Sequence, residues 1–181
     1  CATYQVMFHQ LYLAVPAFVQ QHGLGSSALS AVFTVSAVVG IALQWPVSRW
    51  LVPRLGDAAA MGSGLALMGT AFLSPLVLAA WPQAAMLVLA TLLSLGSILC
   101  FPLFATVLPR YARDCPLGTC YGFMSSVGGC AALVGQAAVG AGLGANASPT
   151  SGVWWALAAC GVLGGVGMWR VTRSPGTPST P

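Results

Sequence analysis

The sequence contains no lysine and no glutamate, so its charge rests on arginine and two acidic residues. Charged residues make up 4% of the chain, against roughly 25% in an ordinary soluble domain. Hydrophobic residues make up 57%, and the mean hydropathy is +0.86. The net charge of +4 would suggest nucleic acid only if the arginines lined a soluble face, whereas they lie between apolar segments. The composition excludes a nucleic-acid-binding domain and predicts a polytopic membrane protein.

Several catalytic motifs are also missing. A phosphate-binding loop of the form Gly-x-x-x-x-Gly-Lys needs a lysine, and the glycine-rich run 140–144 lies at the end of an apolar segment, which excludes a dinucleotide site. An intramembrane serine protease needs Gly-x-Ser-Gly, a spacing that the run Met61–Gly64 breaks. We therefore expect no enzyme activity and no cofactor.

The six cysteines form no pattern that predicts cross-links. Cys100, Cys130 and Cys160 fall inside apolar segments, where cysteine behaves as a small hydrophobe. Cys115 and Cys120 flank a predicted loop that has no matching pair of His or Cys. We expect neither structural disulfides nor a metal site.

What the sequence does have is a series of apolar segments, each long enough to cross a bilayer as a helix. Spacings of four residues between Ser125 and Gly129, and between Gly140 and Gly144, predict that the fifth segment is a central, closely packed helix. The predicted fold class is all-α: a polytopic bundle of six transmembrane helices over residues 1–173, followed by a disordered cytosolic tail at 174–181. The segments cover about Ala2–Val19, Ala28–Val47, Ala58–Ala80, Gln83–Leu108, Thr119–Leu143 and Val153–Val171.

The arginines are confined to alternate ends of these segments. Two spans return a chain to the same side of a membrane, so all the arginines lie on one side, and the positive-inside rule makes that side cytosolic. We expect a multi-pass protein of the cell (plasma or inner) membrane with both ends in the cytoplasm. The segment Gln44–Asp57 is predicted to be a short aqueous turn, with Asp57 capping the next helix. The arginine pairs are Arg49 with Arg54, Arg110 with Arg113, and Arg170 with Arg173.

Six spans with basic turns after the second and the fourth resemble one half of a major facilitator superfamily (MFS) transporter. The family motif Gly-x-x-x-Asp-Arg-x-Gly-Arg-Arg is matched only by Arg54 and Gly56, because Pro53 replaces the Asp and Asp57-Ala58 replaces the basic pair. Such erosion is typical of the family's C-terminal half. The sequences of residues 4–19 and 29–51 resemble spans 7 and 8 of bacterial drug-efflux members.

The resemblance implies two three-helix inverted repeats and alternating access against a missing N-terminal half of six further spans. In that arrangement the first, second, fourth and fifth helices face a shared cavity, while the third and sixth lie behind. The first and fourth helices would be counterparts, and each carries a Pro-x-Phe, at Pro16–Phe18 and Pro102–Phe104. We assign a cytosolic gate to Arg49, Arg54, Asp57, Arg110 and Arg113.

The strongest polar stripe lies in the first segment. Gln5, His9 and Tyr12 share one helical face, and an ionisable group at membrane depth indicates a functional site by default. The alternative is that His9 bridges two helices through hydrogen bonds. In the second segment, Ser36, Gly40 and Gln44 form a stripe that should face other helices. Other intramembrane serines are more often packing contacts than ligands. The predicted substrate-binding residues are Gln5, His9, Tyr12, Ser36, Ser94, Ser97 and Ser125.

The resulting hypothesis is a transporter that moves a small molecule, with efflux of amphipathic or drug-like compounds implied by the resemblance. No acidic residue lies inside a predicted span, so coupling to a proton would rest on His9 or on the missing half. The alternative is a self-contained six-span scaffold or sensor protein without transport activity. The expected partners are a small-molecule substrate, the lipid bilayer and the missing half.

Overall fold

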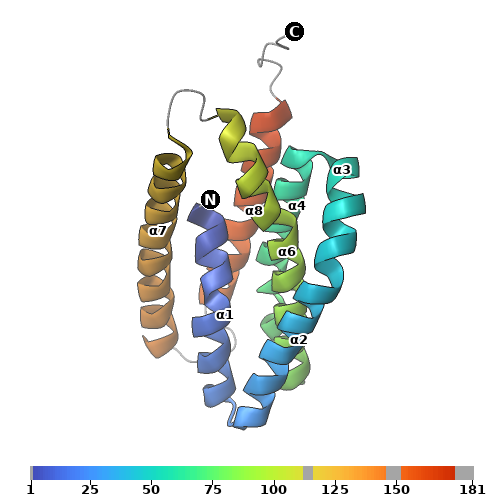
Figure 1. The fold of residues 1–181 in the computed structure, drawn as a ribbon. Coiled ribbons are helices and arrows are strands. Elements are labelled where there is room, and N and C mark those ends of the chain that lie inside the picture. Colours follow the sequence, from blue (N-terminus) through green and yellow to red (C-terminus); the bar gives the residue numbers. More distant parts are fainter. Residues whose placement is uncertain (1, 112–115, 146–151, 174–181) are drawn as a thin grey trace.

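The structure is a computed structural model that describes residues 2–111, 116–145 and 152–173, and these ranges are helical apart from short connections (Figure 1). The predicted all-α fold is confirmed over the described residues, and the helix ends differ from the predicted ones by a few positions, except after the second segment and within the third. The elements are α1 (Ala2–Gln21), α2 (Ser26–Pro46), the π-helical stretch η1 (Val47–Leu51), α3 (Val52–Leu55), α4 (Asp57–Ala71), α5 (Ser74–Val77), α6 (Pro82–Tyr111), α7 (Leu117–Ala145) and α8 (Gly152–Arg173).

The helices stand side by side along one axis (Figure 1). α4 packs on α8 and on α6, while α7 packs on α1 and α2 packs on α6. The N-terminal end of α1, the region of α3 and the C-terminal end of α8 lie at the same end of the bundle, at the top of Figure 1. We call this the basic end, because the described arginines all belong to segments that finish there.

Five stretches of the described residues are long and apolar enough to cross a membrane: Ser26–Leu55, Asp57–Val77, Pro82–Leu103, Leu117–Leu143 and Gly152–Arg170. The first predicted span is not among them, because Gln5, His9 and Gln10 lower the hydropathy of α1. Nevertheless, α1 packs against α7, α6, α8, α4 and α2. Neighbouring helices therefore shield much of its polar surface from lipid, as expected for polar groups at membrane depth.

The basic segment after α2 corrects one prediction. Gln44–Asp57 is not a short aqueous turn, because the helical chain continues through η1 and α3 and breaks only at Gly56, where φ is +78°. A helix bonds its own backbone and can project beyond the bilayer, so exposure to water does not require a turn. A positive φ is accessible to glycine without a steric penalty, which explains the sharp reversal at this residue.

The predicted cap at Asp57 is also wrong. Gly56 occupies the N-cap of α4 and makes no side-chain cap bond, while Asp57 is the first helical residue. A carboxylate in the first turn still faces the positive end of the helix dipole. The side chain therefore supports the helix start by its charge rather than as the N-cap residue.

The third predicted span is broken. α4 ends at Ala71, and α5 begins at Ser74 with Pro75 in its first turn. Pro75 has no N–H to offer the carbonyl of Ala71 four residues earlier. The Ser74 hydroxyl lies 2.7 Å from that carbonyl oxygen and 3.0 Å from the Ala85 carbonyl oxygen on α6, so it supplies the missing donor and ties the break to α6.

Glycines set the closest helix contact, between α4 and α8. A Cβ added at Gly165 would lie 2.6 Å from the Gly62 carbonyl oxygen, and one at Gly69 would lie 2.7 Å from the Val162 nitrogen. The prediction of a central, closely packed fifth segment is wrong in this structure, because a Cβ at Gly129 or Gly140 of α7 would meet no atom within 4 Å. Glycines in close contact with backbone atoms of other helices lie along α4, which packs between α8 and α6, whereas on α7 Gly135 approaches the Val6 side chain of α1.

Candidate functional site

The seam where α1 and α2 face α6 contains most of the candidate site. Near the middle of this seam, the hydroxyls of Ser36 on α2 and Ser94 on α6 lie 2.6 Å apart and share a hydrogen bond. Ser94 is buried, and the Ser97 hydroxyl donates to the Ser94 carbonyl at 2.8 Å. The structure thus brings together three of the predicted substrate-binding residues, although Ser36 and Ser94 bond to each other.

A cavity of about 330 Å³ opens between the seam's midpoint and the basic end. Its polar groups are the Gln44 amide, the Ser97 hydroxyl and the phenol of Tyr4, and none of its lining residues is charged. A Cβ added at Gly40 would meet no atom within 4 Å, which leaves the α2 wall open. Of the predicted stripe, Ser36 contacts another helix through Ser94, whereas Gly40 and the exposed Gln44 border the cavity. The lining residues are Tyr4, Phe8, Gly40, Gln44, Ser97, Ile98, Phe101 and Pro102.

Aromatic rings dominate the α1 side of the seam. Tyr4 stacks on Phe8 with 5.8 Å between ring centroids, and Phe8 meets Tyr12 edge to face at 6.1 Å. Tyr12 in turn stacks on Phe33 of α2 at 5.8 Å. Positions 4, 8 and 12 share one helical face, so the ladder runs from the cavity to the middle of the seam. Stacked rings of this kind suit flat, apolar ligands.

His9 and Gln5 lie beside this ladder and do not line the cavity. The His9 Nδ1–H donates to the Gln5 carbonyl at 2.8 Å, so the imidazole bonds within its own helix rather than bridging two helices. Its ring meets Phe8 edge to face at 6.2 Å. Ser125 is exposed on α7, the helix that packs on α1.

The sequence reading missed several residues of the site. In the sequence, Tyr4, Phe8 and Phe101 resemble ordinary lipid-facing or core aromatic residues. Only the packing of α1 and α2 against α6 in the structure shows that they line one cavity. Gln10 was also missed: it is fully buried, its amide nitrogen donates to the Val6 carbonyl at 3.2 Å, and its amide oxygen has no partner. A glutamine at membrane depth was the signal that could have found it.

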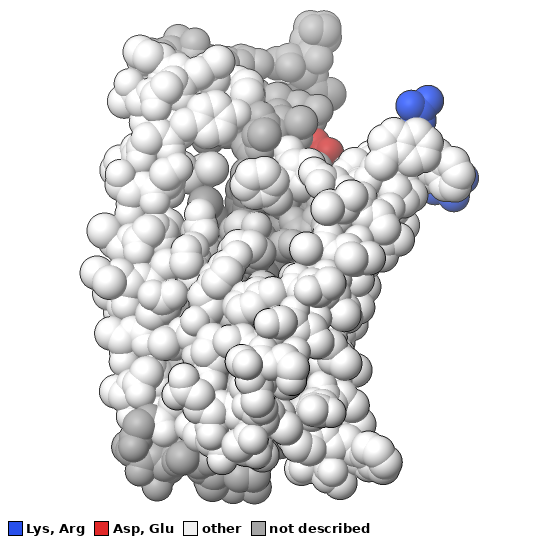
Figure 2. Space-filling view, turned by 60° about the horizontal axis from the view of Figure 1, so that its bottom comes forward, with Lys and Arg blue, Asp and Glu red and all other residues white. Residues whose placement is uncertain are grey.

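The predicted gate residues lie at the basic end. Arg49 lies over the Trp45 ring at 5.4 Å, and Trp45 and Trp50 are mostly exposed beside it. Arg54 is exposed at the end of α3, and Asp57 follows after Gly56. Figure 2 shows the basic side chains that are in view at one projecting end of the molecule. Arg110 lies near the end of α6 at the same end, whereas Arg113 falls outside the described residues.

An apolar helical bundle with arginines at one end and an uncharged aromatic cavity within it defines a multi-pass membrane protein. Two curated proteins from two strains of Mycobacterium tuberculosis, each described as an uncharacterized MFS-type transporter, are 27% identical to this chain over 173 residues. The match covers 90% of this chain and 41% of the length of each relative. No protein-family model and no solved structure matches the chain.

These relatives bear out the predicted resemblance to MFS-type transporters, to which the chain is similar over most of its length; the likeness to drug-efflux members stays a prediction. They carry no information on substrate or on the direction of transport. The chain spans less than half of their length.

Proposed function

We propose that this chain is the C-terminal six-helix half of a membrane transporter that moves small amphipathic or apolar compounds by alternating access. The observation that carries the proposal is the uncharged aromatic cavity between α1, α2 and α6, in a chain homologous to MFS-type transporters. In this assignment α1 is the first of six membrane spans and joins the five apolar stretches that are long enough to cross a bilayer. Its polar face then turns toward neighbouring helices and substrate rather than lipid.

The helix contacts support an inverted repeat. If the first three spans are exchanged with the last three, α1 corresponds to α6, α2 to α7, and α4 to α8. Under this exchange the packing of α1 on α7 corresponds to the packing of α6 on α2, and both contacts are present. The α4–α8 contact corresponds to itself. This is the pattern expected of two three-helix repeats, with α4 and α8 behind the helices that bear the cavity.

The cavity chemistry supports the substrate class. Its volume of about 330 Å³ lies at the lower end of the range for small-molecule sites, roughly 300–1,000 Å³. Rings of Tyr4, Phe8 and Phe101 offer stacking surfaces, while Gln44 and Ser97 offer hydrogen bonds. A compound with an aromatic body and one or two polar groups fits this lining, and an anion would find no cationic partner there.

The other predicted roles are part of the same proposal. His9 is the intramembrane group of this half that could take up a proton, and the residues at the basic end form a cytosolic gate. The export direction rests on the likeness to drug-efflux members. The proposed binding residues are Gln5, His9, Tyr12, Ser36, Ser94, Ser97 and Ser125; the proposed gate residues are Arg49, Arg54, Asp57, Arg110 and Arg113.

Transport by the full-length protein in proteoliposomes tests the function, with fluorescent amphipathic amines and neutral aromatic dyes as substrates. Phe101→Ala removes a ring that lines the cavity and should lower apparent affinity about fivefold, since one stacking contact contributes about 1 kcal/mol. Leu163→Ala changes a side chain that is 69% exposed on α8, away from the cavity, and should transport normally. No dye movement, or equal transport by both variants, would contradict the proposal.

A self-contained six-span scaffold or sensor protein is the alternative. It predicts that the natural protein has no second set of spans and moves no compound across the membrane. The length of the curated relatives favours the transporter, because this chain accounts for 41% of them.

A further inference from the structure

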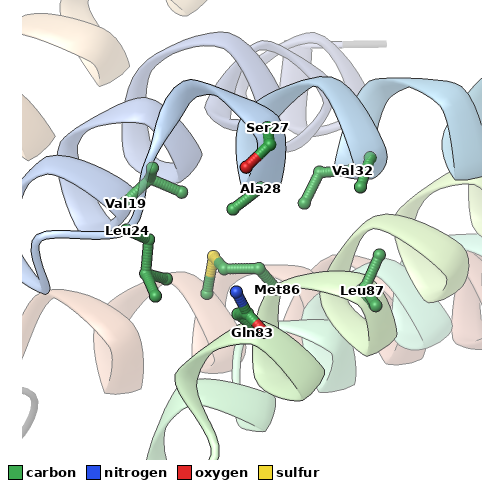
Figure 3. A pocket seen from close by; sticks show the side chains of 9 residues that line it. Val19, Leu24, Ser27, Ala28, Val32, Gln83, Met86 and Leu87 are labelled. Atoms are coloured by element: carbon green, nitrogen blue, oxygen red, sulfur yellow. The ribbon is translucent and has the colours of Figure 1, made fainter.

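A second cavity lies at the other end of the α1–α2–α6 seam, away from the arginines (Figure 3). Its volume is about 180 Å³, and its walls are mainly apolar, with Val19 and Leu24 on one side and Met86 on another. Figure 3 shows the Ser27 hydroxyl of α2 and the Gln83 amide of α6 directed into this space from two sides. It is therefore a small apolar cavity with two hydrogen-bonding groups. We call it the outer cavity.

The outer cavity is distinct from the cavity to which transport is assigned. Along α6, its lining residues Gln83 and Met86 precede Ser94, whereas Ser97 and Phe101 of the other cavity follow it. The Ser36–Ser94 hydrogen bond and the stack of Tyr12 on Phe33 lie between the two spaces. A hydroxyl pair at 2.6 Å leaves no room for a ligand at that level of α2 and α6. The two cavities are therefore separate sites in this conformation.

We propose that the outer cavity binds one small, uncharged aromatic compound that carries a single hydrogen-bonding group. An enclosed apolar cavity of about 150 Å³ is known to hold one benzene ring. The outer cavity is open on the side where Ser27 and Gln83 are exposed, and its volume of about 180 Å³ accommodates a ring with a short polar substituent. Ser27 offers a hydroxyl and Gln83 an amide, which together can satisfy an alcohol as donor and acceptor. The lining contains no charged residue, so an ion would lose its hydration without a partner.

The route into the outer cavity is on the same side of the bundle. A neighbouring hollow lined by Trp81 and Pro82 shares Leu24, Gln83 and Leu87 with it, and Trp81 is 71% exposed. A ligand thus enters past Trp81 without passing the Ser36–Ser94 bond. This site goes beyond the proposed transport function, because occupying it requires no passage through the membrane.

Photolabelling of the full-length protein in lipid nanodiscs tests this site. The probe is a phenyl diazirine that carries a hydroxymethyl group, and labelled peptides are mapped by mass spectrometry with and without excess benzyl alcohol. Labelling within residues 24–32 and 83–87 should saturate with probe concentration, and excess benzyl alcohol should reduce it about tenfold. Labelling that rises linearly and is not displaced would show partition into lipid only and would overturn the proposal.

Two variants of α2 provide the matched comparison. Ala28→Phe places a ring in the outer cavity and should remove the saturable labelling, whereas Ala37→Phe adds the same ring at an exposed position that lines neither cavity. Equal labelling of the two would contradict the site. If Ala28→Phe does not fold, the Val32→Ala variant tests the site instead. It enlarges the cavity and should shift the preferred competitor from benzyl alcohol to naphthyl methanol, and an unchanged preference would overturn the proposal.

Discussion

At the scale of single residues, Ser36 and Ser94 join α2 to α6 by a hydrogen bond at the centre of the seam. Their hydroxyls are 2.6 Å apart, and Ser94 is buried. Hydrogen bonds between transmembrane helices contribute modestly, with double-mutant cycles averaging about 0.6 kcal/mol and reaching about 1.7. Because one partner is buried, we expect this pair to contribute about 1 kcal/mol, which lies within that range.

A double-mutant cycle measures this contribution. Ser36→Ala and Ser94→Ala should each lower the free energy of unfolding by about 1 kcal/mol, and the double variant should lose little more, since either change breaks the same bond. Unfolding of the full-length protein in mixed micelles is the measurement. Ser126→Ala is the control, because the Ser126 hydroxyl is exposed and donates within α7 to the Gly122 carbonyl. Additive losses in the cycle would refute the direct bond.

His9 is the second residue that invites a test, and the chain supplies its own control. The Nδ1–H of His9 donates to the Gln5 carbonyl at 2.8 Å, and the Nδ1–H of His22 donates to the Phe18 carbonyl at 3.0 Å. His9→Ala and His22→Ala therefore remove the same local bond. If His9 contributes to binding or proton coupling, only His9→Ala should change the affinity or the pH profile of transport in proteoliposomes. Loss of thermal stability alone in both variants would reduce His9 to a structural role.

Some residues of the site could be predicted from the sequence and others could not. Ser36, Ser94 and Ser97 could be selected because a hydroxyl inside an apolar helix seeks a partner, and the structure places all three on the α2–α6 seam. Tyr4, Phe8 and Phe101 could not, because aromatic side chains occur in the core, in ligand sites and at the membrane surface alike. Their significance depends on which helices become neighbours, and this is not encoded within any one helix.

At the scale of elements, the distance between two packed helices depends on which glycines face the neighbouring helix. The four-residue spacing on α7 predicted close packing, but a Cβ added at Gly129 would meet no atom within 4 Å, while one at Gly161 of α8 would overlap the Cα of Gly69 on α4. Spacing along one helix identifies a face but does not say what lies opposite. The break between α4 and α5 likewise depends on Pro75 together with the carbonyl of Ala85 on another helix.

Glycine substitutions on α8 test this packing. Gly161→Ala should destabilise the folded protein by about 1–3 kcal/mol, because overpacking forces the backbones of α4 and α8 apart. Gly167→Ala meets no atom within 4 Å and should be neutral or stabilising by up to about 1 kcal/mol, since alanine favours the helix more than glycine does. Thermal unfolding of the purified protein compares the two. Equal effects would mean that α4 and α8 do not pack as described.

At the scale of the whole molecule, the side on which the arginines lie was the most informative feature of the sequence. Successive arginine pairs are separated by two apolar segments, so the chain crosses the membrane twice between them and each pair returns to the same side. In the structure, the described arginines lie at one end of the bundle. The order of helices along the chain cannot state which of them become neighbours. That arrangement appears only in the structure, where α7 packs on α1 as α2 packs on α6.

The central claim is that the cavity between α1, α2 and α6 is reached alternately from the two sides of a membrane. A single cysteine at Ser97, which lines the cavity, reports on this directly in full-length protein whose native cysteines have been replaced. Leu55→Cys, 41% exposed at the basic end, is the one-sided control and should react with a membrane-impermeant thiol reagent from the cytosolic side alone.

The measurement is the rate of Ser97→Cys labelling from each side, with and without a transported dye. Alternating access predicts that Ser97→Cys reacts from both sides, and that the dye slows labelling from both and changes the ratio of the two rates. Reaction from one side only, at a rate that the dye does not change, would contradict the account.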